Sequence, residues 1–352
     1  MKTRNLSVIL LVTACLLGCG SNKPKHNSRD NSERPRFTNP LLPSGADPWV
    51  TSHNRMYYIT HSTGNSLKLY RTGAVSQLVQ AESKIVWTPP ATGMNSKEIW
   101  APEIHRVNGK WYFYYAADDG DNNHHRMWVL ENSSEDPFEG TWIDKGKMEL
   151  PDDKWAIDGT IFEHNGSLYF MWSGWEGDVN VRQDIYITRM SNPWTPQGNR
   201  VRLSKPELDW EIKGASADLP TINEGPQFLK HDNSVFIIYS ASGCWTDDYS
   251  LGMLQADSNA DLMAVTSWVK SPLPVFQKNP DGEAFGPGHN SFFQSPDGKE
   301  DWIIYHANPE PGQGCNAFRS PRMQPFTWSN DGRPYFGTPA PVGKAMAIPS
   351  GE

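Results

Sequence analysis

The feature that most constrains the fold of this chain is a short unit that recurs five times along it. In each copy an acidic or polar residue stands just before a β-hairpin, built from a strand-like run, a polar turn and a second strand. In the fourth copy, Glu224 precedes Gly225-Pro226 and the hairpin spans 227–240. The five marker residues are Asp47, Glu103, Asp158, Glu224 and His289, at steps of 56, 55, 66 and 65 residues.

Each unit has room for about four short strands. Unit two, for example, contains the aromatic run 111–115 and, after a polar loop, a second run at 126–130. Self-similar four-stranded units bury both faces of their sheets by stacking radially. We therefore predict an all-β fold, a five-bladed β-propeller with four antiparallel strands per blade. The first strand of every blade would line the central axis, so the marker residues would meet in one pocket there.

Composition and charge agree with this fold and limit the classes of molecule that the protein could bind. The chain has 15 Trp, 29 Gly and 28 Pro among 352 residues, and no stretch shows a sustained amphipathic helix period. Its net charge of −8 comes with no basic tract, which predicts no nucleic-acid partner. An acidic chain rich in Trp and Tyr is typical of proteins that bind carbohydrate.

The N-terminus has the pattern of a lipoprotein signal peptide over residues 1–19. Residues 1–4 are positively charged, and the apolar run 6–17 is too short to span a bilayer. Leu16-Leu17-Gly18-Cys19 resembles a bacterial lipobox, in which Cys19 carries the lipid. A plain secretory signal with an incidental cysteine is the alternative.

The rest of the chain divides into a tether and a folded domain. Residues 20–36 are polar and predict a flexible tether, and residues 37–352 would form a single propeller domain. The lipid alone would hold this domain at a membrane, which predicts a location in the bacterial cell envelope, periplasmic or surface-exposed.

Cys244 and Cys315 are the cysteines within the predicted domain. They fall in the fourth and fifth units, which would be neighbours in a ring. An exported protein can form a disulfide, and two buried free thiols are the alternative, so the sequence leaves this question open. No cysteine spacing is typical of a metal site.

Three of the marker residues are the carboxylates Asp47, Asp158 and Glu224. Cleavage of a glycosidic bond needs a protonated acid at the leaving oxygen and an ionised base that activates water. Burial and mutual repulsion can separate the pKa values of two carboxyl groups in this way. Asp47 before Pro48 and Asp158 before Gly159 are also common turn residues, which is the alternative for each.

Four motifs in this chain resemble glycoside hydrolase family 43. They are GADPWV (45–50), EIWAPEI (98–104), IDGTIF (157–162) and INEGPQF (222–228), and the resemblance covers about residues 40–342. It implies a five-bladed β-propeller of inverting arabinan and xylan hydrolases. Motif by motif, it implies Asp47 as general base, Glu224 as general acid, and Asp158 as the group that orients the acid and tunes its pKa.

The resemblance also implies contacts around the sugar. Trp100 would pack on it, His289 in GPGHNSF would organise the pocket near a bound calcium or water cluster, and Arg322 in SPRMQPFTW would reach the sugar. A hydrogen-bonded core histidine and a salt-bridged arginine are the alternatives for the last two. Glu103 has no catalytic role in the pattern and is expected to be structural. No cofactor is required, although a structural Ca²⁺ is compatible with the family; no linear calcium loop is visible.

Within the family, the segments around Asp47, Glu224 and Arg322 look most like the α-L-arabinofuranosidase branch. We therefore expect a monomeric, exo-acting enzyme that releases L-arabinose from arabinan, a plant cell-wall polysaccharide, or from arabino-oligosaccharides. The alternatives are a β-xylosidase or an endo-arabinanase of the same family, and a catalytically inactive glycan-binding propeller lipoprotein.

Overall fold

Strands make up nearly all regular structure in residues 34–352, the part of the chain that the computed structural model describes. The all-β prediction is therefore confirmed. The predicted signal peptide, Cys19 and the tether up to residue 33 lie outside the described residues. The described helices are short 3-10 turns: η1 Val75–Gln80, η2 Asn122–His124, η3 Pro151–Asp153, η4 Val265–Ser267 and η5 Pro280–Gly282. None of the helices in this part of the chain is long and apolar enough to cross a membrane.

The strands follow the chain in groups of four antiparallel neighbours. The first group is β2 Trp49–His53, β3 Met56–Thr60, β4 Leu67–Thr72 and β5 Glu82–Trp87. The second is β6 Lys97–Val107, β7 Lys110–Asp118, β8 Arg126–Asn132 and β9 Ile143–Lys147. The third is β10 Ala156–His164, β11 Ser167–Trp175, β12 Arg182–Asn192 and β13 Thr195–Ser204.

Two further groups and one strand pair complete the architecture. The fourth group is β14 Thr221–His231, β15 Ser234–Ala241, β16 Ser250–Asp257 and β17 Val269–Lys270, and the fifth is β18 Phe285–Gln294, β19 Asp301–Asn308, β20 Ser320–Trp328 and β21 Pro334–Tyr335. A short parallel pairing of β12 with β14 joins the third and fourth groups into one sheet. β1 Arg36–Phe37 pairs with β22 Met346–Ala347, so the end of the predicted tether lies in a strand.

Tight polar turns connect the first two strands of several groups. Asn108-Gly109 and Asn165-Gly166 both have left-handed φ values, 49° and 80° in the first pair and 48° and 72° in the second. Two such residues in a row form the hairpin turn whose twist matches that of the flanking strands. The second strands are apolar on both faces because both are covered; every residue of 111–118 in β7 is buried.

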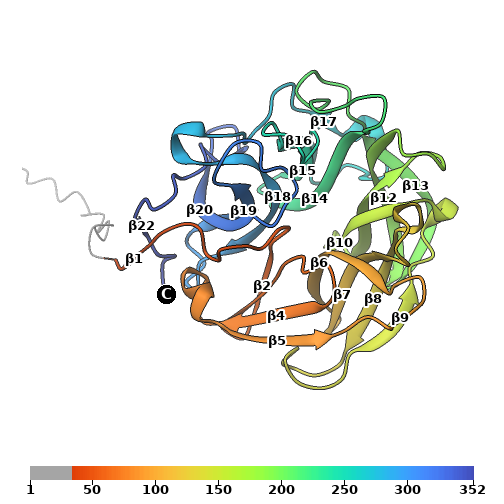
Figure 1. The fold of residues 1–352 in the computed structure, drawn as a ribbon, viewed down its shortest axis with the longest axis horizontal. Coiled ribbons are helices and arrows are strands. Elements are labelled where there is room, and N and C mark those ends of the chain that lie inside the picture. The colour runs from red at the N-terminus through yellow and green to blue at the C-terminus, as the bar shows by residue number, and fades with distance from the viewer. Residues whose placement is uncertain (1–33) are drawn as a thin grey trace, which may run out of the picture. The chain divides into compact units, whose positions relative to one another are not determined.

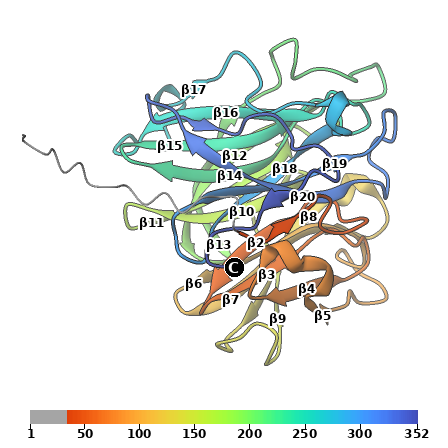
Figure 2. The same ribbon diagram turned by 90° about the vertical axis from the view of Figure 1, so that its left-hand side faces the viewer.

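The hydrophobic core is divided into clusters that lie between consecutive groups of strands. Tyr114 of the second group, for example, packs in one cluster with Phe170 and Trp172 of the third. The last cluster joins Tyr57 of the first group to Trp302 of the fifth. Figure 1 shows the sheets following one another around a common centre, and Figure 2 shows the strands of this arrangement from the side. This arrangement is consistent with a β-propeller.

Candidate active site

Within the first strand of each group, or shortly before it in the first group, one residue has a left-handed backbone. These residues are Asp47, Ala101, Asp158, Gly225 and His289, with φ values between 41° and 56°. In β6, β10, β14 and β18 the residue lies within a shift of the strand register, which is the mark of a β-bulge. A bulge re-aims a side chain, and left-handed backbone at a non-glycine residue costs about 1–3 kcal/mol and is typical of functional sites.

These bulges bring most of the predicted site residues into one pocket of about 400 Å³. Asp47, Asp158, Glu224, Trp100 and His289 all line it, although they come from five different parts of the chain. The pocket volume lies near the low end of the roughly 300–1,000 Å³ usual for small-molecule sites. The three carboxyl groups therefore lie together in one pocket, as the sequence predicts.

A larger depression of about 520 Å³ lies elsewhere on the surface. Its charged residues are paired with one another: Glu176 accepts hydrogen bonds from Arg202 and Arg182, both at 2.7 Å, and Arg200 donates to Asp152 at 3.0 Å. Since these charges are already neutralised by their partners, we place the candidate active site in the pocket with three carboxyl groups.

Asp47 is surrounded by groups that favour its charged form. The Ser62 hydroxyl donates to its Oδ2 at 2.5 Å, and Arg319 Nη1 lies 3.4 Å from its Oδ1. Burial alone would raise the pKa of Asp47, but His289, Arg319, His306 and the Ser62 hydroxyl outweigh it and hold the pKa well below its usual range. Asp47 is therefore ionised at neutral pH.

The two histidines near Asp47 are themselves neutral at neutral pH. Burial lowers the pKa of both His289 and His306. The backbone N–H of Asp47 donates to Nδ1 of His306 at 3.1 Å, which requires that nitrogen to be unprotonated. The lasting positive charge beside Asp47 at neutral pH is therefore the guanidinium of Arg319.

Glu224 has the opposite environment. Burial raises the pKa of Glu224 to about 7, and the charge on Asp47 adds to the rise. The Tyr249 hydroxyl, which donates to Oε1 of Glu224 at 2.7 Å, and Arg319 oppose this shift. At neutral pH a large fraction of Glu224 therefore holds a proton that it can donate.

Asp158 lies close enough to Glu224 for the charges of the two carboxyl groups to interact. Burial raises the pKa of Asp158 well above its usual range, and the charges of Glu224 and Asp47 add to the rise. Its Oδ2 accepts a hydrogen bond from the backbone N–H of Gly225 at 3.0 Å, directly after Glu224. Because the two carboxyl groups repel each other's charge, the pair favours at least one shared proton.

His289 lies between the carboxylates from the fifth group of strands. Its Nδ1 is 3.4 Å from Oδ1 of Asp47 and 3.9 Å from Oδ2 of Asp158. A Cβ on Gly225 would lie 3.3 Å from the same nitrogen, and the backbone of Gly225 is left-handed, so this position favours glycine. The ring is therefore held close to Asp47 and Asp158 together.

Trp100 lines the pocket with its indole stacked on His125, at a ring centroid distance of 4.1 Å. His125 in turn lies 2.8 Å from Asp118, and both side chains are fully buried. Within residues 34–352, Glu98, Asp118 and His125 form the one group whose ligand atoms lie close enough to hold a metal ion. The contact between His125 and Asp118 gives a second explanation for the same group, since it supports the imidazole on which Trp100 stacks.

The expectation that Arg322 reaches the sugar is not met. Its side chain is fully buried within β20, and its guanidinium donates to the backbone oxygens of Glu283 at 2.7 Å and Ala307 at 3.4 Å. Arg319, at the end of the loop before β20, lines the pocket instead. The two arginines are three residues apart, and the strand places Arg322 in the packed interior while the loop places Arg319 in the pocket wall.

Glu103 lies away from the pocket in a hydrogen-bonded network. Its Oε1 accepts from Nε2 of Gln227 at 2.5 Å and its Oε2 contacts Nε2 of His105 at 2.8 Å. In the second group the left-handed position belongs to Ala101, two residues earlier, so Glu103 does not occupy the position that Asp47, Asp158 and His289 share. Ala101 contributes through its backbone N–H, which donates to the Ser62 hydroxyl at 2.7 Å.

Several pocket residues were not found by sequence reasoning. Four of them line the pocket from loops: Ser62, Trp155, Trp245 and Arg319. A fifth residue, Tyr249, lies outside the lining and donates a hydrogen bond to Glu224. Cys244 and Cys315 form a disulfide, which answers the question that the sequence left open, and both cysteines line the pocket. The one signal in the sequence was the cysteine pair itself, because it predicts that the loops near residues 244 and 315 meet.

Comparison with known proteins gives consistent matches. The model of the Glycosyl hydrolases family 43 matches residues 37–334. The chain is 37% identical over 350 residues to an extracellular exo-α-(1→5)-L-arabinofuranosidase of Streptomyces avermitilis, covering 97% of this chain and 71% of that protein. It is 40% identical over 276 residues to a protein of the same description from Streptomyces chartreusis, covering 77% and 82%. The crystal structure of an α-L-arabinofuranosidase from Lactobacillus brevis superposes with a TM-score of 0.82 at 37% identity, covering 88% of this chain and 98% of that one.

Proposed function

The chain belongs to the glycosyl hydrolases of family 43, and on that premise we propose that it is an exo-acting α-L-arabinofuranosidase. It releases L-arabinose from the ends of arabinan or arabino-oligosaccharides with inversion at the anomeric carbon. The observation that carries the chemistry is the pairing, in one pocket, of an ionised Asp47 with a protonatable Glu224. Inverting hydrolysis needs one carboxyl group in each of these states.

In the proposed mechanism, Asp47 takes a proton from water as that water attacks the anomeric carbon. Glu224 gives its proton to the glycosidic oxygen as the bond to the leaving sugar breaks, so the leaving sugar departs as a neutral alcohol. Asp158 acts as a positioning residue, because it accepts the N–H of Gly225, the residue directly after Glu224, while burial and the charges of Glu224 and Asp47 raise its own pKa. Each role is supported by the contacts of that residue in the pocket.

The exo mode is supported by the size of the pocket and by the relatives. A pocket of about 400 Å³ suits a chain end and its first linkage better than a long stretch of polymer. Trp100 offers an aromatic face to the bound arabinofuranosyl ring, and Arg319 and His289 offer polar contacts to its hydroxyl groups. Arg319 thus takes the sugar-binding role that was expected of Arg322.

The test is product analysis with the full-length protein. Linear α-1,5-arabinan, branched arabinan and xylobiose would each be incubated with it and the products separated by chromatography. Arabinose as the sole product from arabinan is expected. Arabino-oligosaccharides would instead mean an endo-arabinanase, xylose release a β-xylosidase, and binding of arabinan without hydrolysis an inactive glycan-binding protein.

We also propose that the groups of strands are five blades of a closed propeller. Support comes from their first strands, since β2 contacts β6, β6 contacts β10, β10 contacts β14, β14 contacts β18, and β18 contacts β2. The hydrophobic clusters follow the same cycle, with one between each group and the next and one between the fifth and the first.

For the location, relatives described as extracellular support export of this chain. We propose further that residues 1–19 are a lipoprotein signal, that Cys19 carries the lipid, that residues from 20 up to the start of β1 form the tether, and that residues 37–352 act as one monomeric catalytic domain. Replacement of Cys19 by Ala should move the protein from the membrane fraction to the soluble fraction of cells. A membrane-bound Cys19→Ala variant would overturn the lipid assignment.

A calcium ion near His289 stays a proposal. Support comes from Asn290, the next residue, whose side-chain amide is buried and has no hydrogen-bond partner among the described residues. Amide oxygens are ligands that Ca²⁺ accepts. The ion would hold the pocket in shape, and the acid–base steps above are carried by Asp47 and Glu224 themselves.

A further inference from the structure

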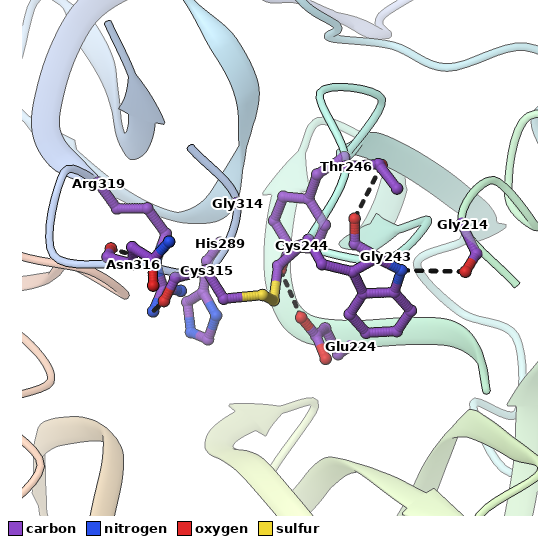
Figure 3. The surroundings of a disulfide bond; sticks show 12 residues. Gly214, Glu224, Gly243, Cys244, Thr246, His289, Gly314, Cys315, Asn316 and Arg319 are labelled. Atoms are coloured by element: carbon purple, nitrogen blue, oxygen red, sulfur yellow. Dashed lines mark hydrogen bonds between the residues drawn. A yellow bond between two sulfur atoms is a disulfide. The ribbon is translucent and has the colours of Figure 1, made fainter. Parts of the chain in front are cut away.

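The disulfide between Cys244 and Cys315 joins two loops that form one wall of the pocket. Cys244 lies in loop 242–249, which follows β15, and Cys315 lies in loop 309–319, which precedes β20. Figure 3 shows the bond between these loops, with Arg319 and His289 on the Cys315 side and Glu224 next to Cys244. Glu224, Arg319 and both cysteines line the pocket.

Each of these loops also contacts one of the two reacting carboxyl groups. Tyr249, at the end of the first loop, donates to Glu224 at 2.7 Å. Arg319, at the end of the second loop, lies 3.4 Å from Asp47 and donates through Nη2 to the backbone oxygen of Cys315 at 3.1 Å. The disulfide therefore connects the surroundings of the acid to those of the base.

Trp245, next to Cys244, is held rigidly in this wall. Its Nε1 donates to the backbone oxygen of Gly214 at 3.0 Å. A Cβ on Gly243 would lie 2.2 Å from the indole, and a Cβ on Gly214 would lie 2.6 Å from its Nε1, so both glycines leave the space that the ring fills. The indole is half-buried and lines the pocket, which leaves part of it open to a ligand.

The position of Trp245 near Glu224 indicates which part of the substrate would contact its indole. Glu224 protonates the leaving oxygen, so the leaving sugar lies on the Glu224 side of the pocket. In the sheet, Glu224 pairs with Ser240 on β15, and loop 242–249 continues directly from that strand. Leu219, 43% exposed, is a further apolar side chain of the pocket lining.

We propose that Trp245, braced by the Cys244–Cys315 disulfide, forms the subsite for the leaving sugar, a second arabinofuranosyl unit of an oligosaccharide. The proposal rests on the exo-arabinofuranosidase function above. In this subsite the indole contacts one face of the leaving sugar. The disulfide is a positioning element, since it fixes the separation between the Trp245 loop and the Arg319 loop.

The test compares two substrates that share the arabinose to be released but differ in the leaving group. One is α-1,5-arabinotriose, whose leaving group is a disaccharide, and the other is methyl α-L-arabinofuranoside, whose leaving group is methanol. For Trp245→Ala, the ratio of kcat/KM on the triose to that on the methyl glycoside should fall about tenfold, mainly through KM. Trp194→Ala, which removes a half-buried tryptophan outside the pocket, should keep the wild-type ratio.

The disulfide is tested with the double variant Cys244→Ser, Cys315→Ser. The same ratio should fall about three- to tenfold, because the two loops lose their fixed separation. Circular dichroism and thermal unfolding report whether this variant folds, and the Trp245→Ala result decides the subsite if it does not.

The outcomes separate this inference from the function on which it rests. A wild-type protein that cleaves neither substrate would contradict the proposed function. A wild-type protein that cleaves both, with a Trp245→Ala variant that loses the same factor on each or loses nothing, would overturn the subsite while the function stands.

Discussion

Asp47 and Glu224 are both largely buried carboxyl groups in one pocket, yet their pKa values move in opposite directions. Burial favours the neutral form of each. Around Asp47 the effect of burial is reversed by His289, Arg319, His306 and the Ser62 hydroxyl, while around Glu224 the Tyr249 hydroxyl and Arg319 only moderate it. The comparison teaches that the neighbours of a buried carboxyl group, and not its burial alone, decide whether it is ionised or protonated, and so which of the proposed roles of base and acid it can fill.

Removing either carboxyl group should have the largest effect, and the leaving group should tell the two apart. Asp47→Asn and Glu224→Gln should each lower kcat on α-1,5-arabinotriose by about 10²- to 10⁴-fold. On an arabinofuranoside with an activated aryl leaving group, Glu224→Gln should recover much of its loss, because that leaving group needs no proton, and Asp47→Asn should not. Steady-state kinetics measure both, and recovery by Asp47→Asn would reverse the two assignments.

Removing the charge of Arg319 should act on both carboxyl groups at once. Arg319→Met should raise the pKa of Asp47 and of Glu224, since its charge lowers both, and so move both limbs of the pH profile upward. Loss of a charged contact should also reduce kcat/KM on arabinotriose by about 10- to 100-fold. Arg333→Met, at an exposed arginine outside the pocket, is the control. A shift of one limb alone would contradict the shared role of Arg319.

The fall of kcat/KM at high pH should follow the pKa of Glu224. In the proposed mechanism Glu224 donates a proton, so kcat/KM should be highest below its pKa and fall as the pH rises through about 7. Tyr249→Phe removes the hydroxyl that stabilises the ionised form, so the pKa of Glu224 and the alkaline limb should move to higher pH. Stopped assays across the pH range measure the limb, and a move to lower pH would contradict the role of Tyr249.

The smallest effect is expected at Ser62. Its hydroxyl donates to Asp47, so Ser62→Ala should raise the pKa of Asp47 and bring the acid limb to higher pH. The alkaline limb should stay in place, since Ser62 is not among the groups that shift the pKa of Glu224. A change confined to the alkaline limb would mean that Ser62 acts on the acid instead.

The sequence predicted the carboxyl groups better than it predicted their neighbours. Asp47, Asp158 and His289 occupy the same left-handed position of the repeated unit, so their spacing carried structural information. Glu224 stands one residue before that position and Glu103 two residues after it, because bulges shift the strand register by amounts that a count of residues does not contain.

The neighbours come from loops that have no repeat. Arg319 and Arg322 are only three residues apart. Because β20 starts between them, Arg319 lies in the pocket while Arg322 is buried. Trp245 and Tyr249 also come from a loop whose sequence does not recur in the other units, so the repeat does not predict their place. The pKa difference between acid and base therefore depends on residues that the repeat could not identify.

The pairing of β1 with β22 has a consequence for the order of the chain. Arg36 stands opposite Ala347, and the side chain of Asn39 bonds the backbone of Met323 at 2.9 Å through both its oxygen and its nitrogen. The two ends of the described chain thus meet on the same edge, where a short linker could join them. New ends could then be opened in an exposed loop such as 91–94, and every sheet would keep its neighbours. Which sheet comes first along the polypeptide is in this sense arbitrary, and a circularly permuted chain should build the same pocket.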